Sequence, residues 1–354
     1  MKKFLAFFLA LTLCIGLLAC GGSGEQENKD TTPKVEDDGI MKILMIGHSL
    51  GNDSTFMLPD IARKNGVEKL VMGVIYHSGC RLGQHVDYIK NDAAQYAYYE
   101  YDISSSQTYW LRADAAGNFT DYEATMPNDV DIENGTIAQT MKFGIQRHDW
   151  DIVVMQAGVF EAAGVIDSSY KLNIAGDIKT IQNYVLENDI EKGTAPKFAW
   201  NITWACPSDD MLNDTYNKCL YTYFGSADEM YDAITRTAKD VVAPASDWAY
   251  VLPSGTAMQN ARSSKYEPKD LYRDTIHAND FGRTMIGYVW YCTLFGKSIE
   301  ECNIAPVDSH FLLDNLLRNT GKDLELTQEQ KDILVESVKN ALANPYAVTP
   351  SAYQ

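Results

Sequence analysis

The chain has 354 residues, a length that suits one large α/β domain or two small ones. Hydrophobic residues make up 45% of it, as in globular proteins with a packed core. Its formal charge at pH 7 is −18 and no cluster of Lys or Arg stands out. These features argue against binding to nucleic acid or to an anionic surface, and they are compatible with a neutral substrate.

The N-terminus has the pattern of a targeting segment. Lys2 and Lys3 precede an apolar stretch over residues 4–18, and the motif Leu-Leu-Ala-Cys ends at Cys20. This motif resembles a bacterial lipobox, which implies a signal peptide over residues 1–19, cleavage before Cys20 and lipidation of its sulfur. A plain secretory signal or a membrane anchor is the alternative, although the apolar stretch is short for a membrane-spanning helix.

The residues after the targeting segment divide into a tether and a domain. Residues 20–39 are polar, acidic and rich in glycine, so we expect a flexible tether after the lipidated Cys20. No repeat or second boundary follows, which predicts a single domain over residues 40–354 with a β-hairpin excursion on its surface around 100–127. The expected location is the bacterial cell envelope, where the protein is lipid-anchored, faces outward or into the periplasm, and contacts the membrane only through its lipid.

Strand patterns alternate with helix patterns along this domain. Short apolar runs predict strands over 43–46, 70–76, 152–155, 197–204 and 248–252. Amphipathic or capped stretches predict helices over 54–65, 84–99, 136–146, 168–188, 226–241, 280–295 and 327–343. Segments 108–112 and 119–122 predict the hairpin. The alternation predicts an α/β fold with an open parallel sheet of about five strands and helices on both faces.

Glycines or polar residues follow the first three predicted strands. Gly47-His48-Ser49 ends the first, Gly79 lies in the loop after the second, and Gln156 comes directly after the third. Open α/β sheets bind ligands at the carboxyl ends of their strands, so we expect the functional site at these loops. Taken alone, Gly-His-Ser is more typical of an ordinary turn.

A carboxylate and an imidazole stand three residues apart, at Asp274 and His277, just before the helix predicted over 280–295. In a turn, this spacing lets the carboxylate accept a hydrogen bond from Nδ1–H and leaves Nε2 free to take a proton from a hydroxyl. A serine such as Ser49 is a weak nucleophile and needs such a base. Asp-x-x-His before a helix is also an ordinary capping pattern.

The joint occurrence of these motifs over residues 41–300 resembles the SGNH (GDSL-like) hydrolase superfamily. It is most similar to a branch of bacterial secreted proteins of unassigned function that have a Gly-x-Ser first block and a Gln in the third block. The resemblance implies a three-layer, flavodoxin-like sheet and a serine hydrolase that needs no cofactor. It makes Ser49 the nucleophile, His277 the base and Asp274 the acid that orients the base.

The same resemblance assigns the oxyanion donors to the backbone N–H groups of Ser49 and Gly79 and to the side-chain amide of Gln156. Gly79 has an alternative explanation, because a glycine in a loop has a conformational reason to be there. Gly83 is the competing candidate for this donor. His48 stands where the superfamily has Asp or Asn, and Gln156 stands where it has Asn. We expect His48 to form a local hydrogen bond in the turn, with a second base as the alternative.

Weaker candidates for contact with a substrate are His48, His77, Tyr109 and Trp110. Aromatic side chains gather in and just before the excursion, where they predict a binding rim, with ordinary packing as the alternative. They are Tyr96, Tyr98, Tyr99, Tyr101, Tyr109 and Trp110.

Five cysteines follow the lipobox: Cys80, Cys206, Cys219, Cys292 and Cys302. The odd number leaves at least one free thiol or an intermolecular bond. Cys206 with Cys219 and Cys292 with Cys302 are candidate disulfides in an oxidising compartment. No Cys or His spacing suggests a metal site, so we predict none.

The family resemblance therefore implies a serine esterase that hydrolyses an O-acyl ester, above all an O-acetyl ester, on a carbohydrate. We expect an acylated carbohydrate as its partner, no nucleic acid, and a monomer. Two alternatives stay open. One is a surface glycan-binding lipoprotein on a degenerate hydrolase scaffold, and the other is a sugar O-acyltransferase.

Overall fold

The structure is a computed structural model. It describes residues 38–104, 110–114, 116–122, 139–165, 171–190, 194–207, 223–266, 270–312 and 320–354. Cys20, the tether up to residue 37, Tyr109 and Cys219 lie outside the described residues. Within the part that is described, no helix combines the length and the apolar character needed to cross a membrane.

Five parallel strands form the main part of the sheet. They are β1 (Met41–Gly47), β2 (Leu70–Tyr76), β6 (Ile152–Met155), β7 (Lys197–Asn201) and β8 (Tyr250–Leu252). They lie side by side as β2-β1-β6-β7-β8, which is the flavodoxin-like order 2-1-3-4-5. The side chains of β2 and β6 are all buried, because helices cover both faces of the sheet. The predicted α/β fold with a parallel sheet is confirmed.

Three antiparallel strands extend this sheet beyond β2. β3 (Ala97–Asp102) pairs with β2, β4 (Trp110–Ala113) pairs with β3, and β5 (Phe119–Tyr122) pairs with β4. β4 and β5 form the hairpin expected over 108–122. Through β3, however, this hairpin continues the sheet instead of standing apart from it as a surface excursion, and the sheet has eight strands instead of about five.

The tyrosines before the hairpin belong to the core, so the predicted binding rim is wrong for them. The helix predicted over 84–99 ends at Lys90, and β3 takes up most of the tyrosine-rich stretch that follows. The side chains of Tyr96, Tyr98, Tyr99 and Tyr101 are at most 1% exposed. Aromatic residues suit a strand buried on both faces, and here that preference prevails over the helical pattern.

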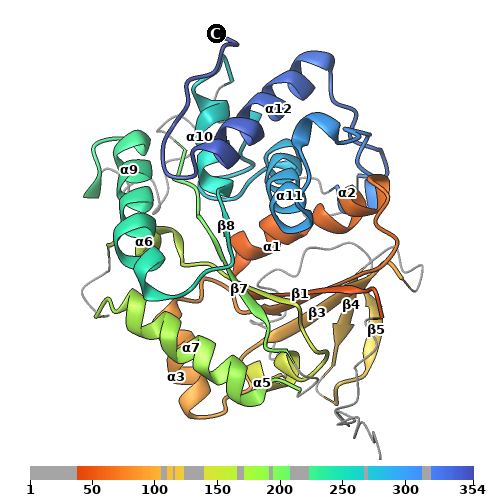
Figure 1. Ribbon diagram of the computed structural model, residues 1–354, viewed down its shortest axis with the longest axis vertical. Helices are drawn as coiled ribbons and strands as arrows, with labels where there is room; N and C mark the ends of the chain where they lie inside the picture. Colours follow the sequence, from red (N-terminus) through yellow and green to blue (C-terminus); the bar gives the residue numbers. More distant parts are fainter. Residues whose placement is uncertain are drawn as a thin grey trace, which may run out of the picture. The chain divides into compact units, whose positions relative to one another are not determined.

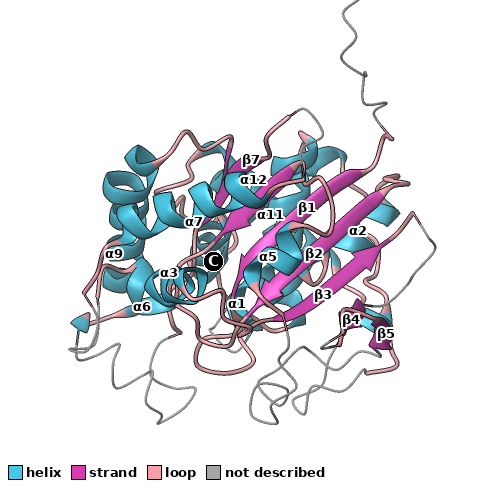
Figure 2. Ribbon diagram, turned by 90° about the horizontal axis from the view of Figure 1, so that it is seen from below, coloured by secondary structure: helices cyan, strands magenta, loops and turns pink. Residues whose placement is uncertain are grey.

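Helices cover the two faces of the sheet (Figures 1 and 2). On one face, α11 (Asp280–Phe295) packs against α1 (Ser49–Thr55), α2 (Leu58–Lys64), α10 (Ser254–Arg262) and α12 (Gln328–Ala343). On the other face, α7 (Ile174–Asn188) packs against α3 (Leu82–Lys90) and α5 (Met141–Ile145). The short α6 (Val159–Ala162) contacts α9 (Ala227–Thr237). The sheet is therefore the middle layer of three.

The observed helix boundaries agree with the predicted ones near the C-terminus and differ from them near Ser49. α11 and α12 match the predicted ranges to within one residue. α1 begins at Ser49 and not near Ser54, because His48 caps it. Ser54 lies inside the helix, and its hydroxyl donates to Leu50 O at 2.8 Å.

Three cysteines in the described residues are free thiols: Cys80, Cys292 and Cys302. The Sγ atoms of Cys292 and Cys302 lie 3.8 Å apart, so one candidate disulfide has its two sulfurs next to each other in the reduced form.

Candidate active site

The candidate site lies at the carboxyl ends of β1 and β6, where the strand order changes direction. The register of these two strands pairs Ile46 with Met155, the residues that precede Gly47 and Gln156. After β2, the N–H of His77 donates to Gly47 O at 3.2 Å. The loops that carry Ser49, Gly79 and Gln156 therefore leave the sheet from three neighbouring strands.

Ser49 is the first residue of α1 and is partly exposed. His48 caps the helix from an extended backbone, and its Nδ1 accepts a hydrogen bond from Leu50 N–H at 3.4 Å. Burial lowers the pKa of His48 to about 4, an effect that the Ala157 backbone opposes. The ring is thus neutral near pH 7 and carries its hydrogen on Nε2. This state fits the expected local hydrogen bond and makes Nε2 a donor, not a base.

Asp274 and His277 form the pair that their spacing predicts. His277 Nδ1 lies 2.7 Å from Asp274 Oδ2. The other carboxylate oxygen accepts the backbone N–H groups of Ile276 and His277 at 2.9 and 2.7 Å. Burial raises the pKa of Asp274, but the hydrogen bond from His277 and the two backbone N–H groups outweigh it and lower the pKa to about 2. The Asp274 carboxylate is therefore ionised. It accepts a hydrogen bond from Nδ1–H of His277, which keeps a hydrogen on that nitrogen.

The second ring nitrogen of His277 is available for a proton. Nε2 is buried and has no hydrogen bond to any described residue. His277 lies close enough to the start of α1 for its charge to lower the pKa of His48. Nε2 therefore has no hydrogen bond from Ser49 Oγ.

Two aromatic side chains fix the Asp274–His277 loop to the segment after β7. Trp204 Nε1 donates to Ile276 O at 2.7 Å, and the hydroxyl of Tyr272 donates to Ala205 O at 2.8 Å. Both aromatic side chains are at most 2% exposed. Asp53 of α1 holds the loop from the other side.

Gln156 is 1% exposed, and neither atom of its amide has a hydrogen-bond partner among the residues that the structure describes. The amide lies against the first turn of α1, where Oε1 would be 3.7 Å from a Cβ added at Gly51. That Cβ would also lie 2.6 Å from Met45 Cε, so a glycine is needed for the helix to start this close to β1. The amide thus has a donor without a partner among the described residues, close to the first turn of α1.

Gly79 lies in a turn in which Cys80 N–H donates to His77 O at 3.2 Å. Its φ of +58° is one that residues with a side chain rarely adopt. The conformation explains the glycine without settling its predicted role as an oxyanion donor. The competitor, Gly83, lies in the first turn of α3.

Glu161 joins the loops after β2 and β6, and sequence reasoning missed it. Its Oε2 accepts Leu82 N–H at 3.1 Å and Gly158 N–H at 3.4 Å. The side chain is 6% exposed, and burial raises its pKa to about 7 although both N–H groups lower it. The Gly-x-x-Glu spacing of a capping box before α6 is the signal that could have found it.

The weaker candidates take different places. His77 Nδ1 lies 2.6 Å from Gln95 O, and the ring packs edge-on against Tyr88. Trp110 begins β4, which is separated from β1 by β2 and β3. Within the described part of the chain, no group of three or more His, Cys, Asp and Glu could hold a metal ion.

One family model matches the chain. It is that of a domain of unknown function, DUF4886, and it matches residues 127–323. This range contains Gln156, Asp274 and His277, whereas Ser49 and Gly79 precede it. None of the curated proteins matches the chain.

Solved structures are similar to this chain to different degrees. A DUF4886 family protein from Bacteroides uniformis is similar at 21% identity and a TM-score of 0.63, over 88% of this chain and 98% of that chain. A catalytic mutant of an acetylxylan esterase from Geobacillus stearothermophilus has 10% identity and a TM-score of 0.37, over 71% and 92% of the two chains. A lipase from a goat rumen metagenome has 8% identity and a TM-score of 0.38, over 71% and 96%. The last two likenesses are too weak to carry an argument about function.

Proposed function

The chain belongs to the DUF4886 family, and we propose that it is a serine esterase. In this proposal Ser49 is the nucleophile, His277 is the base, and Asp274 is the acid that orients the base. The observation that carries the proposal is the state of His277. Its Nδ1 lies 2.7 Å from an ionised carboxylate, and its buried Nε2 has no hydrogen bond to a described residue. A histidine held in this way is prepared to take one proton. The resemblance of the motif order to SGNH hydrolases supports the same assignment.

The mechanism is acyl transfer to water. Ser49 Oγ attacks the ester carbonyl while its proton passes to His277 Nε2, and Asp274 stabilises the imidazolium. The oxyanion receives hydrogen bonds from the backbone N–H groups of Ser49 and Gly79 and from the amide of Gln156. His277 then protonates the leaving alcohol, which gives an acyl-Ser49 intermediate. Water, deprotonated by His277, releases the acid and restores the serine.

The proposed substrate is an O-acyl ester, above all an O-acetyl ester, on a carbohydrate. The resemblance to SGNH hydrolases supports the acylated carbohydrate. The formal charge of −18 supports a neutral rather than a strongly anionic glycan, because like charges slow the encounter.

A lipid anchor on Cys20 would hold this esterase at the cell envelope. The chain enters the domain just before Met41, at the amino end of β1, whereas Ser49 follows the carboxyl end of the same strand. A tether over residues 20–39 would thus join the domain at the edge opposite the candidate site.

One observation favours the alternative of a glycan-binding protein on a degenerate hydrolase scaffold. The hydrogen bond between Ser49 Oγ and His277 Nε2 is absent among the described contacts. Such a protein would bind an acetylated glycan in calorimetry and release no acetate from it.

Acetate release from acetylated mono- and oligosaccharides tests the proposal. We expect release by the wild type and a fall of about 10⁴-fold in His277→Ala, which loses the base. His310→Ala is the matched control, because His310 is an exposed histidine far along the chain from the loop. Release that is equal in all three proteins, or binding without release by the wild type, would contradict the proposal. Transfer of the acetyl group to an added sugar in place of water would identify an O-acyltransferase.

A further inference from the structure

Asp53 is a fully buried carboxylate one helical turn after Ser49. Its Oδ1 lies 2.9 Å from Arg273 Nη1, and its Oδ2 accepts Ala278 N–H at 3.1 Å. Arg283 Nε is also close, at 3.6 Å from Oδ1. A carboxylate without water needs such partners, since its desolvation costs several kcal/mol.

Two of these partners lie on either side of Asp274 and His277, which we call the candidate dyad. Arg273 directly precedes Asp274, and Ala278 directly follows His277. Arg273 N–H also donates to His277 O at 3.0 Å, so the two ends of the loop are paired with each other. One carboxylate on the helix of the nucleophile therefore holds both ends of the loop that carries the acid and the base.

We propose that Asp53 is a positioning residue, which sets the Asp274–His277 loop in register with the helix that begins at Ser49. This inference rests on the proposed esterase function. The transfer of a proton from Ser49 to His277 needs a short contact, and a misplacement of about 1 Å can cost about 10²-fold in rate. Asp53 sets this position because it is part of α1 and is bonded to both ends of the loop. The hydrogen bonds from Trp204 and Tyr272, in contrast, fix the loop only to the segment after β7.

The chain offers a matched control in Asp60 of α2. Asp60 is also fully buried, with Arg63 Nη2 at 2.6 Å and Lys64 Nζ at 2.7 Å, and it accepts Asp308 N–H at 3.1 Å. It has the same chemistry as Asp53 but binds no segment that carries a proposed catalytic residue. Asp53→Asn and Asp60→Asn thus separate positioning from the general loss of a buried ion pair.

The experiment measures two properties of the full chain. One is the rate at which a fluorophosphonate probe labels it, and the other is the low-field proton NMR signal of His277 Nδ1–H. In Asp53→Asn we expect labelling to slow by about 100-fold and the signal to be lost, because the loop is no longer held. In Asp60→Asn we expect both to stay close to wild type. An Asp53→Asn protein that labels as fast as Asp60→Asn and keeps the signal would overturn the inference.

A second pair of variants covers the case in which Asp53→Asn does not fold. Arg273→Met removes the cation opposite Asp53, and Arg273→Lys keeps a charged donor there. We expect the Met variant to lose the signal and the Lys variant to restore part of it; a signal unchanged in both would overturn the inference. If the wild type is not labelled at all, the esterase proposal fails, and the NMR signal still decides whether Asp53 holds the loop.

Discussion

The two edges of the parallel sheet differ in how their buried polar groups are paired. At the carboxyl edge, buried atoms of two side chains have no hydrogen bond to a described residue. They are His277 Nε2 and both amide atoms of Gln156. Each unpaired buried group costs about 1–3 kcal/mol, so this edge carries a cost that a bound ligand or water would remove.

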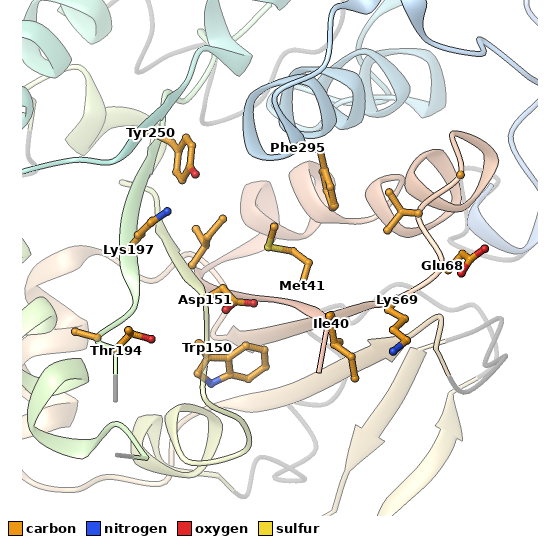
Figure 3. A pocket seen from close by; sticks show the side chains of 15 residues that line it. Ile40, Met41, Glu68, Lys69, Trp150, Asp151, Thr194, Lys197, Tyr250 and Phe295 are labelled. Carbon is orange, nitrogen blue, oxygen red and sulfur yellow. The ribbon is translucent and has the colours of Figure 1, made fainter. Parts of the chain in front are cut away.

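The amino edge has an open cavity of about 820 Å³ (Figure 3). Three of the polar side chains that line it have hydrogen bonds. Trp150 Nε1 donates to Gly144 O at 3.1 Å, Asp151 Oδ2 accepts Lys42 N–H at 2.7 Å, and Lys69 Nζ donates to Asp38 O at 2.9 Å.

The cavity of about 820 Å³ and the candidate site residues therefore lie at opposite edges of the sheet. At the amino edge, Trp150, Asp151 and Lys69 line the cavity and have hydrogen bonds within the chain. The carboxyl edge holds an oriented dyad and an unpaired amide beside the start of α1.

Asp274→Asn should have the largest effect. The asparagine amide can donate to Nδ1 and hold His277 in the wrong tautomer, so we expect kcat to fall by about 10⁴-fold with the fold intact. Steady-state hydrolysis of a short-chain ester measures this. A kcat close to wild type would show that Asp274 does not orient the base.

Gln156→Ala should lower kcat by about 10²–10³-fold with little change in KM, because the lost donor acts in the transition state. The control is Gln182→Ala, since Gln182 of α7 is also buried with an unpaired amide nitrogen. Equal kinetics in the two variants would remove Gln156 from the oxyanion donors.

Glu161→Gln should change the pH dependence of stability. Burial raises the pKa of Glu161 from 4.5 to about 7, so between these pH values the folded chain keeps a proton that the unfolded chain has released. The free energy of unfolding therefore falls as pH rises through this window and levels off above it. At 1.36 kcal/mol per pKa unit, the fall is about 3 kcal/mol.

Denaturation at several pH values measures this slope. We expect it to flatten in Glu161→Gln and to persist in Glu187→Gln, which changes an exposed glutamate of α7. The same slope in both variants would show that Glu161 has an ordinary pKa.

Substitutions at the amino edge should have the smallest effect. Lys197→Met and Tyr250→Phe change side chains that line the cavity, and we expect kcat and KM to match wild type. A large loss of activity in either variant would show that the amino edge takes part in the reaction. The proposed difference in function between the two edges would then be wrong.

The parallel half of the fold follows from the sequence because its strands are buried on both faces and read as apolar runs. Residues 70–76 and 152–155 are strands at the predicted bounds. β3 was missed because its tyrosines continue a helical pattern, and α10 was missed because its residues 254–262 have no marked apolar face.

The candidate dyad was predictable from local spacing, since Asp274 and His277 need only one turn to meet. Its catalytic role stays a prediction. Asp53 was not predictable, because its partners lie 220 and 225 residues away along the chain. The signal that the sequence does contain is a pair of polar residues, Asn52 and Asp53, inside a helix that packs on the sheet.

The most direct test of the central claim is the site at which a fluorophosphonate probe attaches, read by peptide mass mapping. We expect one adduct on the peptide that contains Ser49, and none there in Ser49→Ala. An adduct on another residue, or equal labelling of wild type and Ser49→Ala, would contradict it.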